Sequence, residues 1–306
     1  MVFSFKKSAE RILRCTICQN RGVSIMAIER QNTFGGLIAI DLFLGGAGAG
    51  IFLTSFVLSL LSQFESITRI GVMVGPIWVL AGSMILFFDL GNKNALFRIL
   101  SNPSSWVARG TYFIILFVFF AFLYFLVSLS KTTMLSTVLG GIAGIFSFLT
   151  MLYTGMLFST MKRVPLWNTP ILPLLFIFSS LYAAAAFLIL IVPFSTAPPL
   201  VEIHLLVMIE IVFILVQLLV LGIFLWTGSY GNTTIAESIR LLKEPLFTIG
   251  VISLGLFIPL ALLIYYKFMG SGIFFPIMAA LLLIIGSLFL RYCIIRAGIR
   301  LPLYPV

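Results

Sequence analysis

Eight long apolar segments run through this chain between about Gly35 and Arg296, and they constrain its fold more than any other feature. Of the 306 residues 61% are hydrophobic and 9% charged, which is more apolar surface than a soluble domain can bury. A helix needs about 20 apolar residues to cross roughly 30 Å of hydrocarbon. The segments are continuous rather than alternating, so they predict helices and not barrel strands. We therefore expect an all-α polytopic membrane protein with spans at 36–61, 70–90, 107–129, 134–159, 171–194, 201–227, 245–267 and 273–296.

The protein is predicted to consist of a basic segment at residues 1–34 and one eight-helix membrane domain at 35–306. The first 33 residues lack the apolar core of a signal peptide. They contain Cys15 and Cys18, a single CxxC pair, whereas structural zinc and iron–sulfur sites usually take four ligands. We expect no metal bound by this chain alone. The pair is either two thiols on a short surface helix or a redox or metal site shared with a partner subunit.

The net charge of +10 indicates topology rather than nucleic-acid binding. Eight spans place both termini on one side, and three basic residues, Arg69, Lys131 and Lys267, fall on the other. Basic residues concentrate on the cytoplasmic side, so we expect cytoplasmic termini in the cell membrane. The same face could instead be basic in order to dock an acidic partner. The terminal side carries sixteen basic residues: Lys6, Lys7, Arg11, Arg14, Arg21, Arg30, Lys93, Arg98, Arg109, Lys162, Arg163, Arg240, Lys243, Arg291, Arg296 and Arg300.

Four polar residues from four different spans, Asp41, Asp89, Arg109 and Tyr153, should lie at similar depth near the terminal face. Asp41 is five residues inside its span, about 8 Å below the interface at ~1.5 Å per residue. Trp167 follows in the fourth loop. A quinone needs hydrogen-bonding partners and proton donors or acceptors within reach, and this set supplies both. Asp89 and Arg109 could equally be a structural ion pair.

The sixth span carries three further ionisable residues: Glu202 and His204 toward the opposite face, and Glu210 near the middle of the membrane. They could begin a proton path, although Glu202 and His204 could also be interfacial residues in contact with water. His204 is the only histidine, so this protein cannot hold a haem b between two histidines. We expect most of the buried polar groups in the first four spans and a more uniformly apolar second half.

Small residues four apart, Gly46 and Gly50 in the first span and Gly140 and Gly144 in the fourth, allow helix backbones to approach closely. The pattern fits tight helix packing, and it also fits a flat slot for a planar ligand.

Several short motifs, in this order and spacing, resemble those of the NrfD/PsrC family, the membrane subunits of polysulfide and related respiratory reductases. The resemblance covers nearly all eight spans. Its best pieces are Asp41-Leu-Phe-Leu-Gly-Gly-Ala-Gly-Ala-Gly50, Asp89-Leu90, Asn102-Pro103-Ser104-Ser105-Trp106, Tyr153-Thr154-Gly155, Pro165-Leu-Trp167-Asn168, and Leu290-Arg291-Tyr292 with Gly298.

The resemblance implies a quinone, menaquinone or another, bound in the first four helices. Electrons would pass between it and a ferredoxin-like iron–sulfur subunit on that face, which connects to a catalytic subunit of molybdopterin or hydrogenase type. Tyr153 falls at the family's quinone-binding tyrosine. Asp41 falls at a first-helix position that touches the quinone, where the polysulfide enzyme has His. Many family members carry their catalytic subunits outside the cytoplasm, whereas the charge count here places the site face inside.

The sequence is also compatible with two other functions. A secondary transporter could use the same charged residues for ion coupling, although inverted repeats are not evident in the sequence. The protein could also be a purely structural membrane anchor without quinone chemistry. Quinone content of the purified complex separates the anchor from the quinone-reactive subunit, and reconstituted uptake tests the transporter.

Overall fold

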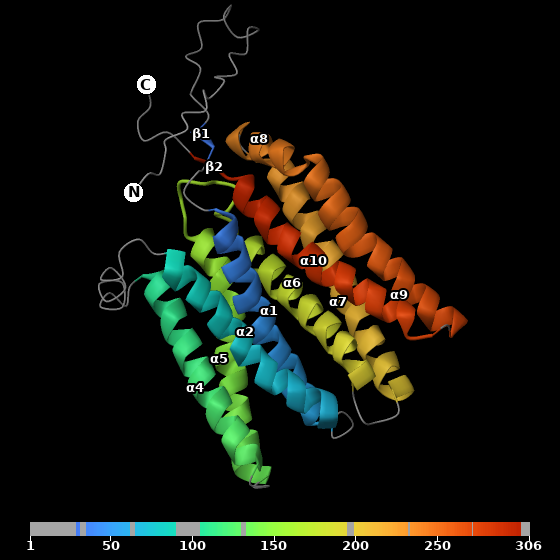
Figure 1. The fold of residues 1–306 in the computed structure, drawn as a ribbon. Coiled ribbons are helices and arrows are strands. Elements are labelled where there is room, and N and C mark those ends of the chain that lie inside the picture. Colours follow the sequence, from blue (N-terminus) through green and yellow to red (C-terminus); the bar gives the residue numbers. More distant parts are fainter. Residues whose placement is uncertain are drawn as a thin grey trace, which may run out of the picture.

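The computed structural model describes residues 29–30, 35–61, 65–89, 105–129, 133–194, 199–231, 233–270 and 272–300 (Figure 1). Eight helical segments within these ranges are long and apolar enough to cross a membrane. The chain is therefore an all-α, multi-pass integral membrane protein, as the sequence predicts. The segments are α1 (Gly36–Ser59), α2 (Glu65–Asp89), α4 (Trp106–Leu129), α5 (Thr133–Ser159), α6 (Ile171–Ile191) with its extension η2 (Val192–Phe194), α7 (Pro199–Ser229), the π-helical η3 (Leu246–Phe257) continued by α9 (Ile258–Met269), and α10 (Phe274–Arg296).

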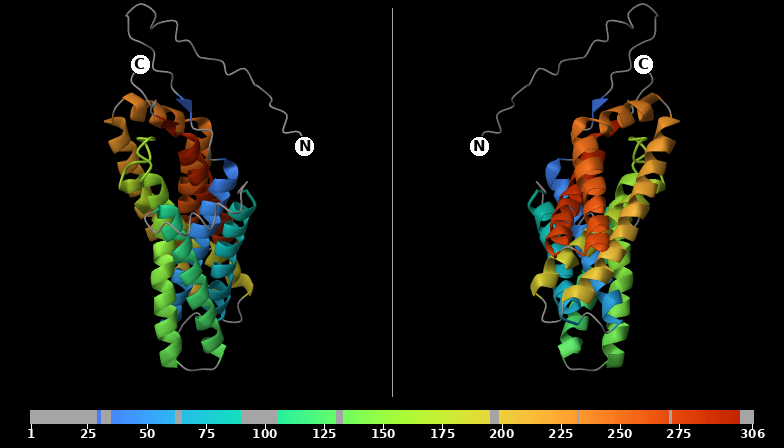
Figure 2. Two further views of the ribbon diagram at one scale, coloured as in Figure 1. Left: turned by 90° about the vertical axis from the view of Figure 1, so that its left-hand side faces the viewer. Right: turned by 90° about the vertical axis from the view of Figure 1, so that its right-hand side faces the viewer.

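The spans form two groups that meet at α1 and α6. α1 packs against α2, α5, α6 and α10, and α6 packs against α5, α7 and α10. The pair α4 and α5 lies at one edge of the bundle, and η3, α7 and α9 lie at the other (Figures 1 and 2). α1 and α6 are accordingly the two most buried spans. A polar group on the inner side of either helix is enclosed by protein rather than by lipid.

Glycines on two faces of α1 explain its central position. A Cβ atom at Gly48 would lie 2.6 Å from the carbonyl oxygen of Gly75 on α2, so these two backbones touch. On another face, a Cβ at Gly50 would lie 2.8 Å from the carbonyl oxygen of Ser180 on α6. Small residues permit such approach between helices in lipid. Of the two interpretations of the Gly46–Gly50 spacing, helix packing is the one that the structure supports.

Both ends of the membrane domain lie on the same side. Strand β1 (Glu29–Arg30) pairs antiparallel with β2 (Ile299–Arg300), with Glu29 opposite Arg300 (Figure 1). The short helix α8 (Thr233–Leu242) lies at this end too. Residues 228–244 lie between two predicted spans, and no helix is predicted there. In the structure, Ile239 and Leu242 share one buried face of α8. α8 is ten residues long, and its apolar side chains recur at helical spacing, so it is an amphipathic helix at the end of the bundle.

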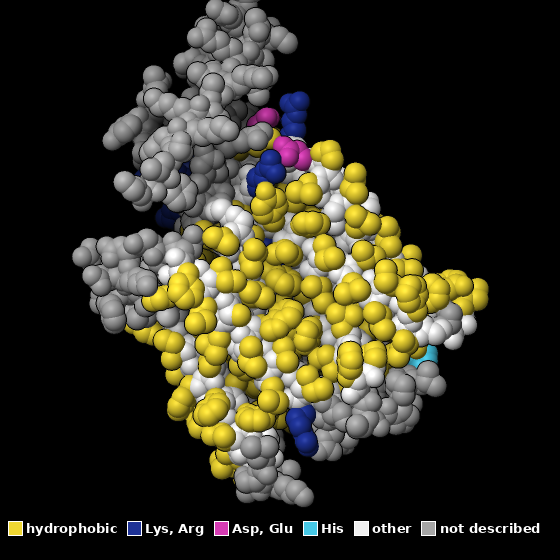
Figure 3. Space-filling model, viewed as in Figure 1, with side chains coloured by type: hydrophobic (Ala, Val, Ile, Leu, Met, Phe, Trp, Pro, Cys, Tyr) yellow, Lys and Arg dark blue, Asp and Glu magenta, His cyan; other side chains and the backbone are white. Residues whose placement is uncertain are grey.

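The lipid-facing surface is covered by large apolar side chains. Figure 3 shows hydrophobic side chains across the whole middle of one face, with the charged groups at its ends. α2 and α4 contribute many of them, including Met84 and Phe122, which are more than half exposed. Because lipid solvates such groups well, this belt is the expected exterior of a spanning bundle.

The structure corrects two expectations drawn from the sequence. Arg291, counted among the basic residues of the terminal face, is fully buried inside the bundle and adds nothing to a surface charge bias. The second half is also not uniformly apolar. Among the described residues, the fully buried ionisable side chains Glu210 and Arg291 and the buried amide Gln217 lie on α7 and α10. Hydropathy averages over a span hide single polar residues that point inward.

Candidate functional site

Asp41 lies on α1 beside Gly82 of α2, where the missing side chain of the glycine leaves space. Asp41 is half-buried, and a Cβ atom at Gly82 would lie 3.2 Å from its Oδ1 and 3.1 Å from its carbonyl oxygen. Any larger residue at position 82 would push on the carboxyl group. Gly82 thus allows α2 to approach α1 at the level of Asp41, which keeps the carboxyl group inside the bundle rather than in lipid.

The phenol of Tyr153 is positioned in the same manner by a glycine on α4. Tyr153 is 8% exposed, and its ring lies directly on Gly110, where a Cβ atom would overlap the ring. The ring therefore fills the groove that the missing side chain leaves. Asp41 is within electrostatic range of the Tyr153 phenol. The two predicted residues lie on α1 and α5, which pack against each other.

The resulting pair has the chemistry that a quinone headgroup requires. A phenol both donates and accepts a hydrogen bond, and a carboxylate accepts one and can take up a proton. Both groups lie among α1, α2, α4 and α5, and both sit where a glycine on a neighbouring helix makes room. The two side chains therefore provide the hydrogen-bonding groups that such a ligand would need.

The remaining residues predicted for this site have other contacts. The Arg109 guanidinium lies 5.2 Å from the ring centre of Trp106 and is exposed. Asp89 ends α2, and its side chain is outside the described part of the structure. Trp167 is buried, and its Nε1–H donates to the carbonyl oxygen of Ile294 over 2.9 Å. Its indole joins the loop after α5 to the end of α10, a packing contact that already uses its only polar group.

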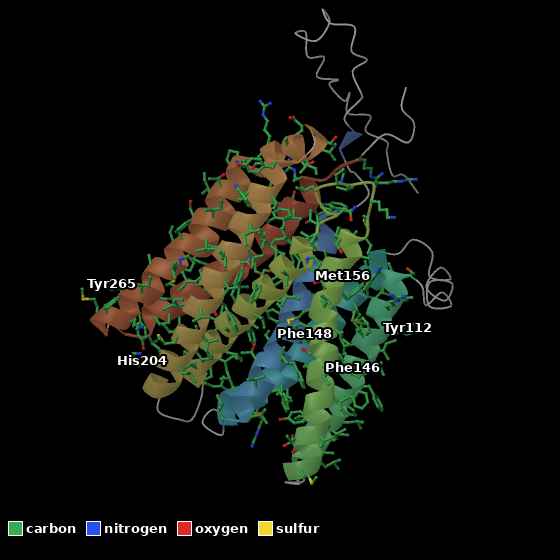
Figure 4. The ribbon with its side chains drawn as sticks, turned by 180° about the vertical axis from the view of Figure 1, so that it is seen from behind. Tyr112, Phe146, Phe148, Met156, His204 and Tyr265 are labelled. Carbon is green, nitrogen blue, oxygen red and sulfur yellow. The ribbon has the colours of Figure 1, made fainter. Side chains whose placement is uncertain are left out.

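The predicted proton-path residues lie on α7, away from Asp41 and Tyr153. His204 is exposed, and its ring centre is 5.4 Å from that of Tyr266 (Figure 4). Figure 4 places His204 at the end of the bundle remote from β1 and β2. Glu210 is fully buried and lies six residues further along α7. The side chain of Glu202 lies outside the described residues, as do Cys15 and Cys18.

Sequence reasoning missed the two glycines, Gly82 and Gly110, because a single glycine in a span carries no distinctive spacing. It also missed the place of Arg291, although an arginine five residues inside a span is a signal for function. Among the described residues, no three His, Cys, Asp or Glu side chains come together as a metal site.

The chain is similar in sequence to membrane subunits of one known family. The family model described as polysulphide reductase, NrfD, matches residues 26–302. The C subunit of the polysulfide reductase of Wolinella succinogenes is 29% identical, over 89% of this chain and 96% of its own length. Protein NrfD of Escherichia coli K12 is 28% identical, over 85% of this chain and 93% of its own length. The chain belongs to the polysulphide reductase NrfD family.

Proposed function

We propose that this protein is the quinone-reactive membrane subunit of a multi-subunit respiratory oxidoreductase. The observation that carries the proposal is the convergence of Asp41 and Tyr153, each seated against a glycine of a neighbouring helix. The relative from Wolinella, a subunit of a polysulfide reductase, supports the same class of complex. The catalytic centre for the terminal substrate would lie in another subunit of that complex.

A quinol, when bound, supplies two electrons and two protons. In this proposal Tyr153 holds one ring oxygen by a hydrogen bond, and Asp41 faces the other and accepts a proton from it. The second proton passes to water near the site. Because Asp41 is about 8 Å from the membrane surface, at ~1.5 Å per residue, its proton can leave to the terminal face.

The electrons require an acceptor close to this site. We propose a ferredoxin-like iron–sulfur subunit on the terminal face, connected in turn to a catalytic subunit of molybdopterin or hydrogenase type. The exposed basic residues at this end, among them Lys162, Arg163 and Arg240, suit an acidic partner surface. Co-purification of the complex and identification of its catalytic subunit would name the terminal substrate.

The Tyr153→Phe variant should oxidise quinol more slowly while its assembly stays normal. Only the hydroxyl is removed, so the ring still fills the groove at Gly110. One hydrogen bond to the ligand is lost, worth about 0.5–1.5 kcal/mol, which corresponds to a few-fold to roughly tenfold loss. Quinol oxidation by the purified complex, measured against its quinone content, tests this expectation.

Tyr182→Phe is not a suitable control, since that hydroxyl is itself buried. Tyr265→Phe removes an exposed hydroxyl from α9 at the opposite end of the bundle and should leave quinol oxidation unchanged. Wild-type rates in Tyr153→Phe would remove the phenol from the proposed site.

We also propose that both termini, and with them the quinone site, face the cytoplasm. Without the buried Arg291, fifteen basic residues on the terminal side still outnumber three on the other. Single cysteines placed at Ser4 and at Ser271, in a background lacking Cys15 and Cys18, report the sidedness. In intact cells an impermeant thiol reagent should label position 271 and not position 4. The reverse pattern would reverse the topology.

A further inference from the structure

The second half of the bundle encloses a group of polar side chains that the quinone site does not use. Arg291, Glu210, Gln217, Tyr182 and Ser287 come from α6, α7 and α10, and each is completely shielded from the surface. Ionisable side chains are rare inside membrane bundles because burial is costly, and where they occur they usually serve transport or proton transfer. Their contacts indicate which of these applies.

Arg291 is held firmly and touches the quinone-binding helix. Its Nη1 donates to Ser287 Oγ at 2.6 Å, and its Nη2 donates to Ser180 Oγ at 2.7 Å. The guanidinium carbon lies 5.8 Å from the ring centre of Phe43, two residues from Asp41 on α1. A Cβ at Gly46 would lie 2.9 Å from Nη2. The cation therefore sits against α1, at about the same depth as Asp41.

Glu210, unlike Arg291, has no hydrogen-bond partner among the described residues. Neither carboxyl oxygen has a hydrogen-bond partner among the described residues, and both atoms are buried. Gln217, two turns further along the same face of α7, is unpartnered at both amide atoms within the described part of the structure. A carboxyl group enclosed without a cationic partner is stable only in its neutral form. Internal water molecules are the usual partners of such groups, and they conduct protons between them.

Tyr182 stands between these two features. Its hydroxyl lies near Ser287 and within electrostatic range of both Arg291 and Glu210, yet it makes no hydrogen bond to a described residue. Among the other helices packed against α7, α9 places Tyr266 beside His204. The order along the membrane normal is thus His204, Glu210, Tyr182 and Arg291. Glu210 is about 10 Å inside its face and Arg291 about 8 Å inside the other, at ~1.5 Å per residue.

We propose that Glu210, Tyr182, Ser287 and Arg291 form a proton relay that connects the level of the quinone site with the face bearing His204. The relay moves protons only. An O–H bond breaks at Glu210, and the proton forms an O–H bond on water or an N–H bond on the His204 ring. A proton arriving past Arg291 and Tyr182 then restores the carboxylic acid. The electrons stay at the quinone site and pass to the iron–sulfur partner. The inference rests on the proposed function, because quinol oxidation supplies the protons.

Glu210→Gln tests the relay, since it keeps the shape of the side chain and removes the exchangeable carboxyl proton. In vesicles containing the purified complex, protons released per electron on the His204 face should fall by on the order of tenfold or more. Quinol oxidation should continue, because Asp41 still delivers protons to the terminal face. Glu237→Gln makes the same chemical change on the surface helix α8 and should keep the wild-type proton count. An unchanged count in Glu210→Gln would overturn the relay.

Two further measurements keep the test decisive if Glu210→Gln assembles poorly. Tyr182→Phe removes one hydroxyl and should also lower the proton count without stopping electron transfer; a wild-type count there would contradict the relay. The infrared carbonyl band of a protonated carboxylic acid should be present in wild type and Glu237→Gln and lost in Glu210→Gln. If the wild-type complex does not oxidise quinol at all, the proposed function fails. If it does, but the carbonyl band survives in Glu210→Gln, the relay alone fails.

Discussion

The Asp41→Asn variant is expected to oxidise quinol on the order of 10²-fold more slowly than the wild-type complex. Asparagine has nearly the shape of aspartate, so α1 should still pack against Gly82 of α2. The amide cannot accept a proton, and this loss exceeds that of a single hydrogen bond. Steady-state quinol oxidation across a range of pH, with the iron–sulfur partner as acceptor, measures the effect.

The quinone content of the purified Asp41→Asn complex is the control measurement. If it equals that of the wild type, the variant has lost proton transfer and has kept the binding site. Glu237→Gln is the matched control, since it exchanges a carboxyl for an amide on α8, outside the spans. It should leave the rate and its pH profile unchanged. If Asp41→Asn behaves like Glu237→Gln in both respects, Asp41 is a structural residue and the proton acceptor lies elsewhere.

Gly110→Ala should lower quinol oxidation at least as much as Tyr153→Phe does, although it changes no polar group. The new Cβ would occupy the space of the Tyr153 ring, which must therefore move. Displacing a positioning group by about 1 Å can cost on the order of 10²-fold in rate. The rate of quinol oxidation per assembled complex measures this effect.

Gly141→Ala on α5 is the matched control, because nothing lies within 4 Å of the added Cβ. A double variant separates displacement of the phenol from general disruption. If Gly110→Ala acts by moving Tyr153, then adding Tyr153→Phe should cost little more, because coupled residues are not additive. Fully additive losses, or a wild-type rate in Gly110→Ala, would show that the ring position does not matter.

The sequence predicted the spans closely because lipid imposes a simple rule on them. Each needs enough apolar residues to cross the hydrocarbon, and the predicted and observed boundaries accordingly differ by only a few residues at most ends. Hydropathy did not predict the amphipathic helix α8, because this helix is short and lies outside the hydrocarbon. There, helix formation depends on packing Ile239 and Leu242 against the bundle, and hydropathy alone does not predict that contact.

The candidate site was predictable only in part. Asp41 and Tyr153 were identified as polar groups at similar depth, and similar depth is all that counting residues along a helix provides. The direction in which each side chain points, and the helix that it faces, depend on tertiary packing. Trp167 illustrates the difference: its place in the loop after the fourth span suggested a residue of the quinone site, whereas packing buries it against the end of α10.

By itself, the sequence determined that this protein spans the membrane eight times and which end of each span carries charge, because both follow from the cost of placing polar groups in hydrocarbon. Only the tertiary structure decided which polar groups face one another. Gly82 makes room for Asp41 and Gly110 makes room for Tyr153. The packing of α7 and α10 encloses Arg291 and leaves Glu210 without a partner among the described residues. Those outcomes depend on contacts between helices distant in sequence, and hydropathy along a single helix contains no information about them.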